Sequence, residues 1–176
     1  MIKISALGYT LIELLLVLSI TSIIGIIGYV NYKDFSSDQI VIKAVSDVQS
    51  VLRLAQSNAT SSTLCSNGQY IGPWSLVFNQ TSIYLTCGLA NQVQKIYNLE
   101  NAQINSILGS SCLEENSSLP FTVQYSNLDG GLDFPSAGSD TCKGSLSWTF
   151  TLTNTIDTSK LKSFTISRGG AIDVEQ

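Results

Sequence analysis

Histidine is absent from this 176-residue sequence, and charged residues make up only 12% of it. The absence of histidine excludes a Ser-His-Asp catalytic triad and any zinc site that has histidine ligands. The formal net charge is −4, whereas a protein that binds nucleic acid normally presents a basic face. The composition therefore predicts a weakly charged, polar surface and disfavours hydrolytic enzymes and nucleic-acid binders.

Charge and proline are both scarce near the N-terminus. Glu13 is the one charged residue among the 22 residues from Tyr9 to Val30, and no proline occurs between Tyr9 and Asn58. A helix of that apolar length rises roughly 33 Å, which is enough to cross the hydrocarbon core of a bilayer. Because a lone acid inside such a helix costs about 2.5–3.5 kcal/mol, Glu13 calls for a functional explanation.

The residues around that acid carry a resemblance to a known family. A short leader, Met1–Gly8, is followed by Tyr9-Thr10-Leu11-Ile12-Glu13 and then by the apolar helix. This arrangement resembles the processing site of type IV pilins and of the related pseudopilins. The resemblance implies that a prepilin peptidase cuts after Gly8 and methylates the new amine of Tyr9. Two positions depart from the family pattern, because Tyr9 replaces the usual Phe and Leu7 replaces a basic residue.

Glu13 lies four residues after Tyr9, so the two residues share one face of the helix. Unpaired ammonium and carboxylate groups are both costly in lipid. The family resemblance implies that Glu13 of one subunit pairs with the Tyr9 amine of a neighbour and thereby sets the axial register of a filament. The alternative is a Glu13 that is tolerated near the membrane interface, where the penalty falls.

The apolar stretch differs from a cleaved secretory signal. It is longer than the 7–15 apolar residues of a signal peptide, and no Ala-x-Ala pattern follows it. We therefore expect a retained single-pass anchor. Lys3 precedes the span, which places the leader in the cytoplasm and the bulk of the chain in the periplasm or outside the cell.

The cysteines fit an exported domain, because an even count there suggests disulfides. Four cysteines allow three pairings, and we favour Cys65–Cys87 with Cys112–Cys142, because each bond then closes a local segment. No Cys-x-x-Cys occurs, so we expect no metal site and no cofactor.

The acid pair Glu114-Glu115 is interpreted as a solvated loop. The stretch 129–133 is interpreted as a bare turn rather than a calcium loop, whose full acidic spacing it lacks.

Beyond the span the apolar residues become periodic, at three- and four-residue intervals typical of an amphipathic helix. They are Ile40, Ala44, Val48, Val51, Leu52 and Ala55. We predict one helix of about 50 residues. Gly25 and Gly28 are either positions of close helix packing in the membrane or a stretch that unwinds locally during assembly. The predicted organisation is a leader (1–8), a transmembrane helix (9–30), its amphipathic continuation (31–60) and a β-rich head (61–176).

The head carries strand patterns of alternating apolar and polar residues. Strands are predicted at 74–78, 82–87, 93–97, 119–125, 147–153, 163–167 and 171–174, whereas 101–108 is predicted to be a turn or short helix. The fold class is α+β, in which the long helix packs against an antiparallel sheet. We expect that sheet to be a meander with one face on the helix stripe and the other in solvent.

These expectations favour a non-enzymatic structural subunit of a type IV pilus or pseudopilus that assembles through its apolar helix. A looser resemblance to H-type minor pseudopilins, through Cys65 and the Trp74 strand, and the absence of a helix proline favour a minor subunit. The alternative is a permanently anchored binding or sensor domain with a pilin-like export signal. The resemblance implies four partners: prepilin peptidase, other pilin subunits, the inner-membrane assembly platform and, before assembly, the lipid bilayer.

Overall fold

The structure is a computed structural model that describes residues 10–65, 72–88, 92–110, 119–126, 131–135 and 145–174. The chain divides into two compact units, residues 1–36 and residues 37–176. One helix, α1, runs from Leu11 to Thr60 over 50 residues, as the periodicity predicts. No proline lies between Tyr9 and Asn58 to interrupt it.

In the second unit, α1 buries one stripe of small and β-branched side chains. Its members are spaced three or four residues apart, as expected for a helix that packs on one side. They are Val41, Ala44, Val45, Val48, Val51, Leu52, Ala55 and Ala59. Ile40, which the sequence places in the stripe, is half-buried at its margin and packs against the core.

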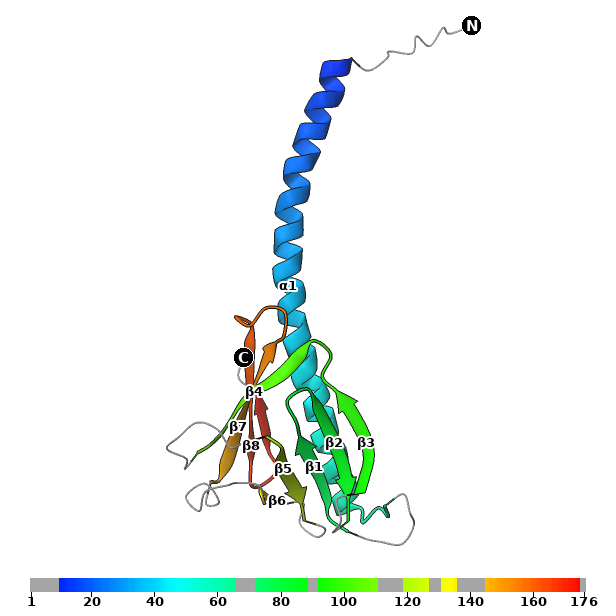
Figure 1. The fold of residues 1–176 in the computed structure, drawn as a ribbon, viewed down its shortest axis with the longest axis vertical. Helices are drawn as coiled ribbons and strands as arrows, with labels where there is room; N and C mark the ends of the chain where they lie inside the picture. Colours follow the sequence, from blue (N-terminus) through cyan, green and yellow to red (C-terminus); the bar gives the residue numbers. More distant parts are fainter. Residues whose placement is uncertain are drawn as a thin grey trace, which may run out of the picture. The chain divides into compact units, whose positions relative to one another are not determined.

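Within the described residues, nine strands follow α1, and they form two antiparallel sheets (Figure 1). Their bounds are β1 Trp74–Phe78, β2 Ser82–Cys87, β3 Gln92–Asn98, β4 Ala102–Gly109, β5 Phe121–Tyr125, β6 Leu132–Asp133, β7 Ser147–Asn154, β8 Leu161–Ser167 and β9 Ile172–Val174. The first sheet has the order β3-β2-β1-β5-β6 and the second has the order β4-β7-β8-β9. The α+β class is confirmed, but the prediction of one meander is wrong.

The chain changes sheets between β3 and β4. The turn buries Leu99, places Asn101 at a φ of 57°, and is held to the β1–β2 connection by a bond from Leu99 N–H to Thr81 O (2.9 Å). Asparagine tolerates this left-handed conformation better than most residues do. After the turn, Ile104 N–H still donates to Gln80 O (2.8 Å), while β4, Ile104 included, pairs with β7.

Strand β4 occupies the segment for which the sequence predicts a turn or short helix. A bulge lies between Ile104 and Ser106, so the buried residues are Ala102, Ile104, Ile107 and Gly109. The three-residue step from Ile104 to Ile107 breaks the alternation of a strand and imitates helical spacing. The prediction is therefore wrong because a bulge shifted the period.

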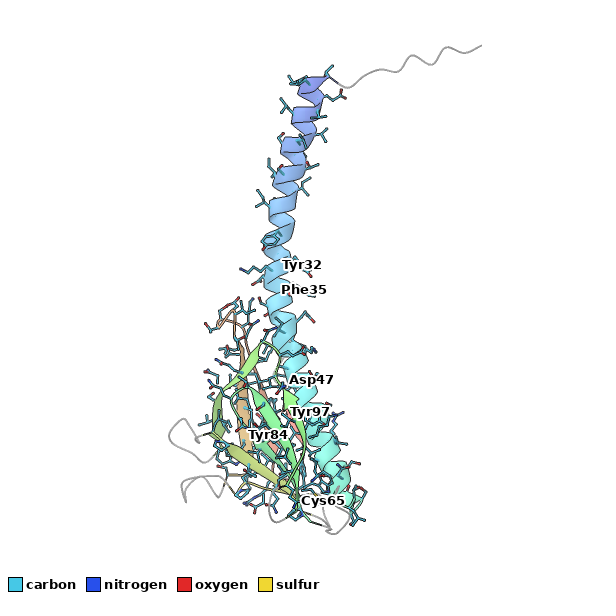
Figure 2. The ribbon with its side chains drawn as sticks, turned by 45° about the vertical axis from the view of Figure 1, so that its right-hand side comes forward. Tyr32, Phe35, Asp47, Cys65, Tyr84 and Tyr97 are labelled. Carbon is cyan, nitrogen blue, oxygen red and sulfur yellow. A yellow bond between two sulfur atoms is a disulfide. The ribbon has the colours of Figure 1, made fainter. Side chains whose placement is uncertain are left out.

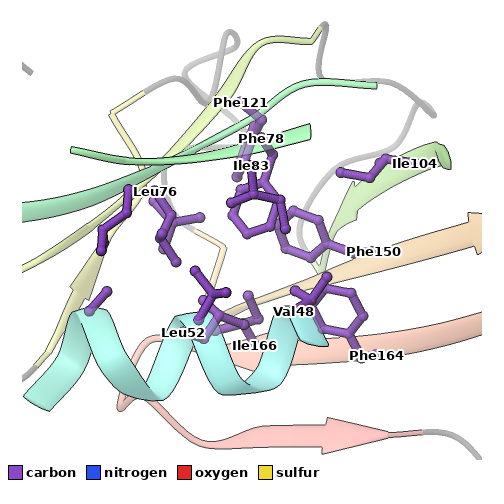
Figure 3. Packing of buried hydrophobic residues seen from close by; sticks show 14 of the residues in the cluster. Val48, Leu52, Leu76, Phe78, Ile83, Ile104, Phe121, Phe150, Phe164 and Ile166 are labelled. Carbon is purple, nitrogen blue, oxygen red and sulfur yellow. The ribbon is translucent and has the colours of Figure 1, made fainter. Parts of the chain in front are cut away.

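The core lies where α1 and both sheets meet, and aromatic rings dominate it (Figure 3). Phe150 of β7 stands 4.9 Å from Phe78 of β1 and stacks on Phe164 of β8 at 5.0 Å, measured between ring centroids. Phe121 of β5 contacts Phe150 and also Trp148. Rings from the two sheets therefore touch directly, which joins the sheets into one core.

Replacement of Phe150 by alanine should lower the free energy of unfolding by about 3–5 kcal/mol, because it leaves a cavity among three other phenylalanine rings. Leu54→Ala is the matched control. Leu54 is 41% exposed on α1, so its truncation should cost less than about 1 kcal/mol. Chemical denaturation of the full chain in detergent measures both values, and equal losses would contradict this account of the core.

Candidate functional site

The first turn of α1 is capped by Thr10. Its Oγ1 accepts a hydrogen bond from Glu13 N–H (3.4 Å), and its carbonyl oxygen accepts from the N–H groups of Glu13 (3.1 Å) and Leu14 (3.2 Å). Thr10 is thus the N-cap and Glu13 the third helical residue, which is the spacing of a capping box. The Thr-x-x-Glu signal was present in the sequence, although the sequence reasoning did not use it.

Glu13 itself lies in the exposed first turn, where a carboxylate interacts favourably with the helix dipole. Within the part of the chain that the structure describes, its carboxylate forms no hydrogen bond or ion pair. The predicted cleavage site at Gly8 and Tyr9, and the leader before it, lie outside the described residues. The predicted pairing of Glu13 with the Tyr9 amine therefore stays a prediction.

The apolar side chains that follow Glu13 are all exposed. Every residue from Leu11 to Ile27 is exposed, and the most apolar 18-residue window of α1 has a mean hydropathy of 2.4 with no part of it buried. The helix is long and apolar enough to cross a membrane. At about 25 cal/mol per Å² of apolar surface, contact with water would be strongly unfavourable, so this half of α1 requires lipid or other helices around it.

The hydroxyl groups within this apolar half are satisfied by the helix. Ser19 donates to Leu16 O (2.8 Å), Thr21 to Val17 O (2.9 Å) and Ser22 to Leu18 O (2.7 Å). Such bonds to the preceding turn remove the cost of placing a hydroxyl in hydrocarbon. The Glu13 carboxylate is thus the polar side chain of this stretch that still needs an outside partner.

Helix α1 continues through both glycines of the span. A Cβ added at Gly25 would meet no atom within 4 Å, so no contact inside the described chain requires a glycine there. The two alternatives for these glycines, close packing against another helix and local unwinding, both concern an assembled or membrane-bound state and stay predictions.

Aromatic side chains follow the apolar stretch along the helix. Tyr29, Tyr32 and Phe35 are 68%, 71% and 62% exposed, and Lys33 and Asp34 lie among them in the sequence. Figure 2 labels Tyr32 and Phe35 on the helix. Aromatic residues concentrate at membrane–water interfaces, where an apolar ring meets a wet surface. We call Tyr29, Tyr32 and Phe35 the aromatic girdle. The sequence reasoning missed the girdle, although its position after the apolar run was a readable signal.

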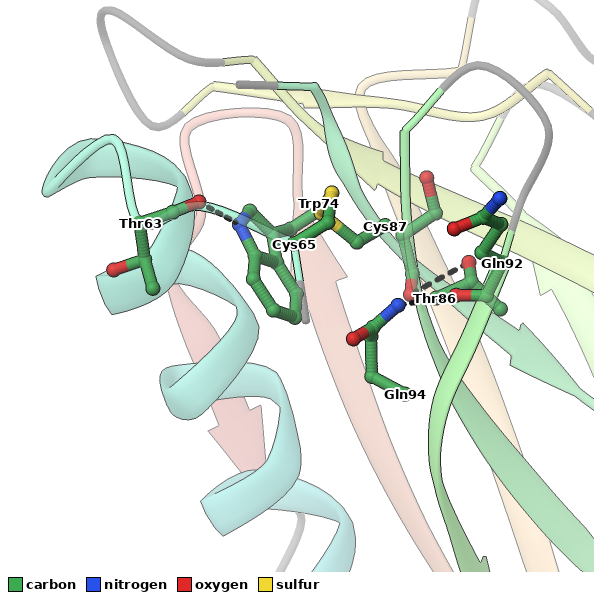
Figure 4. Close-up of a disulfide and its surroundings, with 8 residues drawn as sticks. Thr63, Cys65, Trp74, Thr86, Cys87, Gln92 and Gln94 are labelled. Atoms are coloured by element: carbon green, nitrogen blue, oxygen red, sulfur yellow. Dashed lines mark hydrogen bonds between the residues drawn. A yellow bond between two sulfur atoms is a disulfide. The ribbon is translucent and has the colours of Figure 1, made fainter. Parts of the chain in front are cut away.

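A disulfide joins Cys65 and Cys87, with their Cα atoms 5.7 Å apart (Figure 4). It links the segment after α1 to the end of β2, and Trp74 Nε1 donates to Thr63 O (3.2 Å) beside it. This is one of the two pairings favoured from the sequence. Cys112 and Cys142, which form the other, lie outside the described residues.

The backbone beside this disulfide is tightly packed. Gly88 has a φ of +81° and donates its N–H to Pro73 O (3.0 Å). A Cβ on Gly72 would come within 2.4 Å of Gly88 Cα, so a side chain there would force the two strands apart. Glycines at both positions therefore allow the end of β2 to approach the start of β1.

Other candidate sites receive little support in the described residues. Asp133, from the predicted turn at 129–133, accepts a bond from Phe134 N–H and lies 3.9 Å from Arg168 Nη2. Glu114, Glu115, Asp129 and Gly130 lie outside the described residues. Within the described ranges, no group of three or more His, Cys, Asp or Glu residues could hold a metal ion.

The tyrosine in the core has no role as an acid or base near neutral pH. Tyr125 of β5 is fully buried, and desolvation raises the pKa of its phenol well above the ordinary value of 10.0. Because the neutral form is then retained throughout the neutral range, this side chain serves packing.

No family model matches the sequence, and no curated protein does either. The fold is similar to a crystal structure of the type IV minor pilin FimU of Pseudomonas aeruginosa, with a TM-score of 0.50 and 12% identity. That similarity covers 81% of this chain and 92% of the FimU chain. A second crystal form of FimU aligns with 76% of this chain and 91% of its own, at 14% identity and a TM-score of 0.47. At such identities the similarity concerns the fold.

Replacement of both Cys65 and Cys87 by serine should lower the free energy of unfolding by about 3 kcal/mol. The reason is that the bond joins residues 22 positions apart and so restricts the conformations of the unfolded chain. Denaturation of the full chain in detergent, without reductant, measures the loss. The unaltered chain with reductant serves as a control and should lose at least as much. An unchanged unfolding midpoint in the double variant would contradict a stabilising role.

Proposed function

We propose that this chain is a structural subunit, not an enzyme, of a type IV pilus or a related pseudopilus. It is first held in the cytoplasmic membrane and is then assembled into a helical filament in the periplasm or outside the cell. The observation that carries the proposal is the first half of α1, which exposes every side chain from Leu11 to Ile27 and includes one carboxylate, Glu13, that has no partner among the described residues. The FimU-like fold supports it.

In this proposal, residues 1–8 form the leader, 9–30 the helix of the membrane and filament core, 31–60 its continuation and 61–176 the head. Prepilin peptidase removes the leader after Gly8 and methylates Tyr9. The assembly platform then draws subunits from the bilayer. Lipid and neighbouring helices can replace one another around α1, because both cover the same apolar surface.

Glu13 supplies specificity in a contact that is otherwise non-directional. The apolar side chains between Leu11 and Ile27 can shift along a neighbouring helix at little cost in free energy. A carboxylate in hydrocarbon is stable only where it meets a hydrogen-bond donor or a positive charge. A pair between Glu13 and the Tyr9 amine of the next subunit fixes one axial register. The Thr10 cap orders the helical turn that carries Glu13, which reduces the entropy lost when this carboxylate pairs.

A minor rather than a major subunit is the form we favour. The support is the helix without proline from Tyr9 to Asn58 and the loose likeness of the Cys65–Trp74 segment to H-type pseudopilins. Gly25 and Gly28 then provide any local weakness that the helix needs during packing. We expect no direct binding of nucleic acid, since the formal net charge is −4.

Glu13→Ala should leave processing intact and reduce the amount of assembled filament more than about tenfold, since an unpaired ammonium in the filament core costs over 1.4 kcal/mol. Immunoblots of sheared filaments and of membranes measure assembly and processing separately. Thr21→Val is the matched control, because the Thr21 hydroxyl bonds to its own helix and should not affect assembly. Wild-type filament levels in Glu13→Ala would refute the pairing.

The mature N-terminus separates this proposal from a permanently anchored binding or sensor domain. Mass spectrometry of the chain purified from membranes should find a Tyr9 N-terminus with one added methyl group. The matched control is Gly8→Ala, which should retain the leader because the peptidase no longer has its glycine. An intact Met1 in the unaltered protein would refute the proposal.

A further inference from the structure

The loop between β7 and β8 is fastened to α1. Asn154, fully buried at the end of β7, donates its Nδ2–H to Ser37 O (3.0 Å). Its Oδ1 accepts from the backbone N–H groups of Ile156 (2.8 Å) and Asp157 (3.2 Å). One side chain therefore fixes the loop both to the helix and to itself.

Two further contacts hold the loop in place. Lys160 Nζ lies 3.6 Å from Asp38 Oδ1, and Asp157 Oδ1 accepts from the N–H and the hydroxyl of Ser159. The loop is thus ordered before it meets any partner. Its anchor on α1 consists of Ser37 and Asp38, the first two residues of the second unit.

This ordered loop presents an apolar side chain to solvent. Ile156 is 70% exposed, and Leu161, which begins β8, is 49% exposed. An isolated exposed apolar residue on a surface is ordinary. Here, however, the hydrogen bonds of Asn154 hold the backbone of Ile156 in place while its side chain contributes nothing to the core. A partner outside the chain would explain this arrangement.

The anchor lies close to the end of the apolar span along the chain. Ser37 follows Phe35 of the aromatic girdle by two residues, and two residues in any conformation reach at most about 7 Å. The headgroup layer on each side of a bilayer is itself about 5–8 Å thick. If the girdle lies at the membrane interface, the anchor of the loop must lie at or just above the headgroups.

From these observations we propose that the β7–β8 loop, residues 155–160, together with Leu161 at the start of β8, is a lipid-contact site that rests the head on the bilayer before assembly. Ile156 enters the headgroup region and Leu161 flanks it. The loop carries both signs of charge, Asp157 and Lys160, so the surface it fits is a zwitterionic phospholipid bilayer rather than a strongly charged one. This inference rests on the membrane-held state proposed above.

The test uses the full chain with Ile156→Cys, labelled with an environment-sensitive fluorophore and placed singly in phosphatidylcholine nanodiscs. The matched control is Leu146→Cys. Leu146 is also apolar and 70% exposed, but it directly precedes β7, whereas Ile156 follows the other end of that strand. The eight residues of β7, about 26 Å in length, therefore separate the two positions. Because both side chains are exposed, neither substitution removes a core contact.

The label at position 156 should show blue-shifted emission and several-fold stronger quenching by spin-labelled lipid than the label at 146. Equal quenching at the two positions, including the case in which Ile156 contacts only another subunit, would overturn the lipid contact. Glu13→Ala in the same background separates the two proposals. It should leave the quenching unchanged, so a failed lipid contact and a failed filament role give different results.

Discussion

The need to cover an apolar surface governs this protein. From Leu11 to Ile27 every side chain of α1 is exposed, and the most apolar window has a mean hydropathy of 2.4. The described residues of the second unit form a core of their own, and no side chain from Leu11 to Ile27 is buried. Hydrophobic surface on this scale is tolerated in lipid or against other helices, and each of these environments satisfies the same requirement. The transfer from membrane to filament that we propose uses that equivalence.

The head has a different task, which is to complete a core around the second half of α1. The stripe from Val41 to Ala59 provides one wall and the two sheets provide the others. Phe78 and Phe121 from one sheet meet Phe150 from the other, so the sheets are joined by ring contacts rather than by shared strands. The Cys65–Cys87 bond then ties the chain leaving α1 to the first sheet.

Among the described residues from Thr10 to Ile27, the polar side chains divide into those that bond to their own helix and one carboxylate that does not. Ser19, Thr21 and Ser22 bond to the preceding turn of their own helix, and Thr10 caps its start. Glu13 has no such partner among the described residues. A single unpaired carboxylate on an otherwise non-directional surface is a means of fixing register, as buried polar groups do in helical assemblies. This contrast, more than the length of the helix, favours assembly over simple anchoring.

The sequence alone determined the elements whose signal is local. The length of α1, its change to a one-sided stripe and the β1–β2 hairpin all follow from spacing within a few residues, as does the strand pattern of β7 and β8. The Thr10 cap and the aromatic girdle were also readable.

Only the tertiary structure decided that β4 is a strand in a second sheet, because the bulge at Ile104 disrupts the alternation on which the sequence reading depends. The same is true of the bond between Asn154 and Ser37, which are 117 residues apart. Periodicity reports which side of an element is buried, whereas the choice of its partner depends on packing among distant segments.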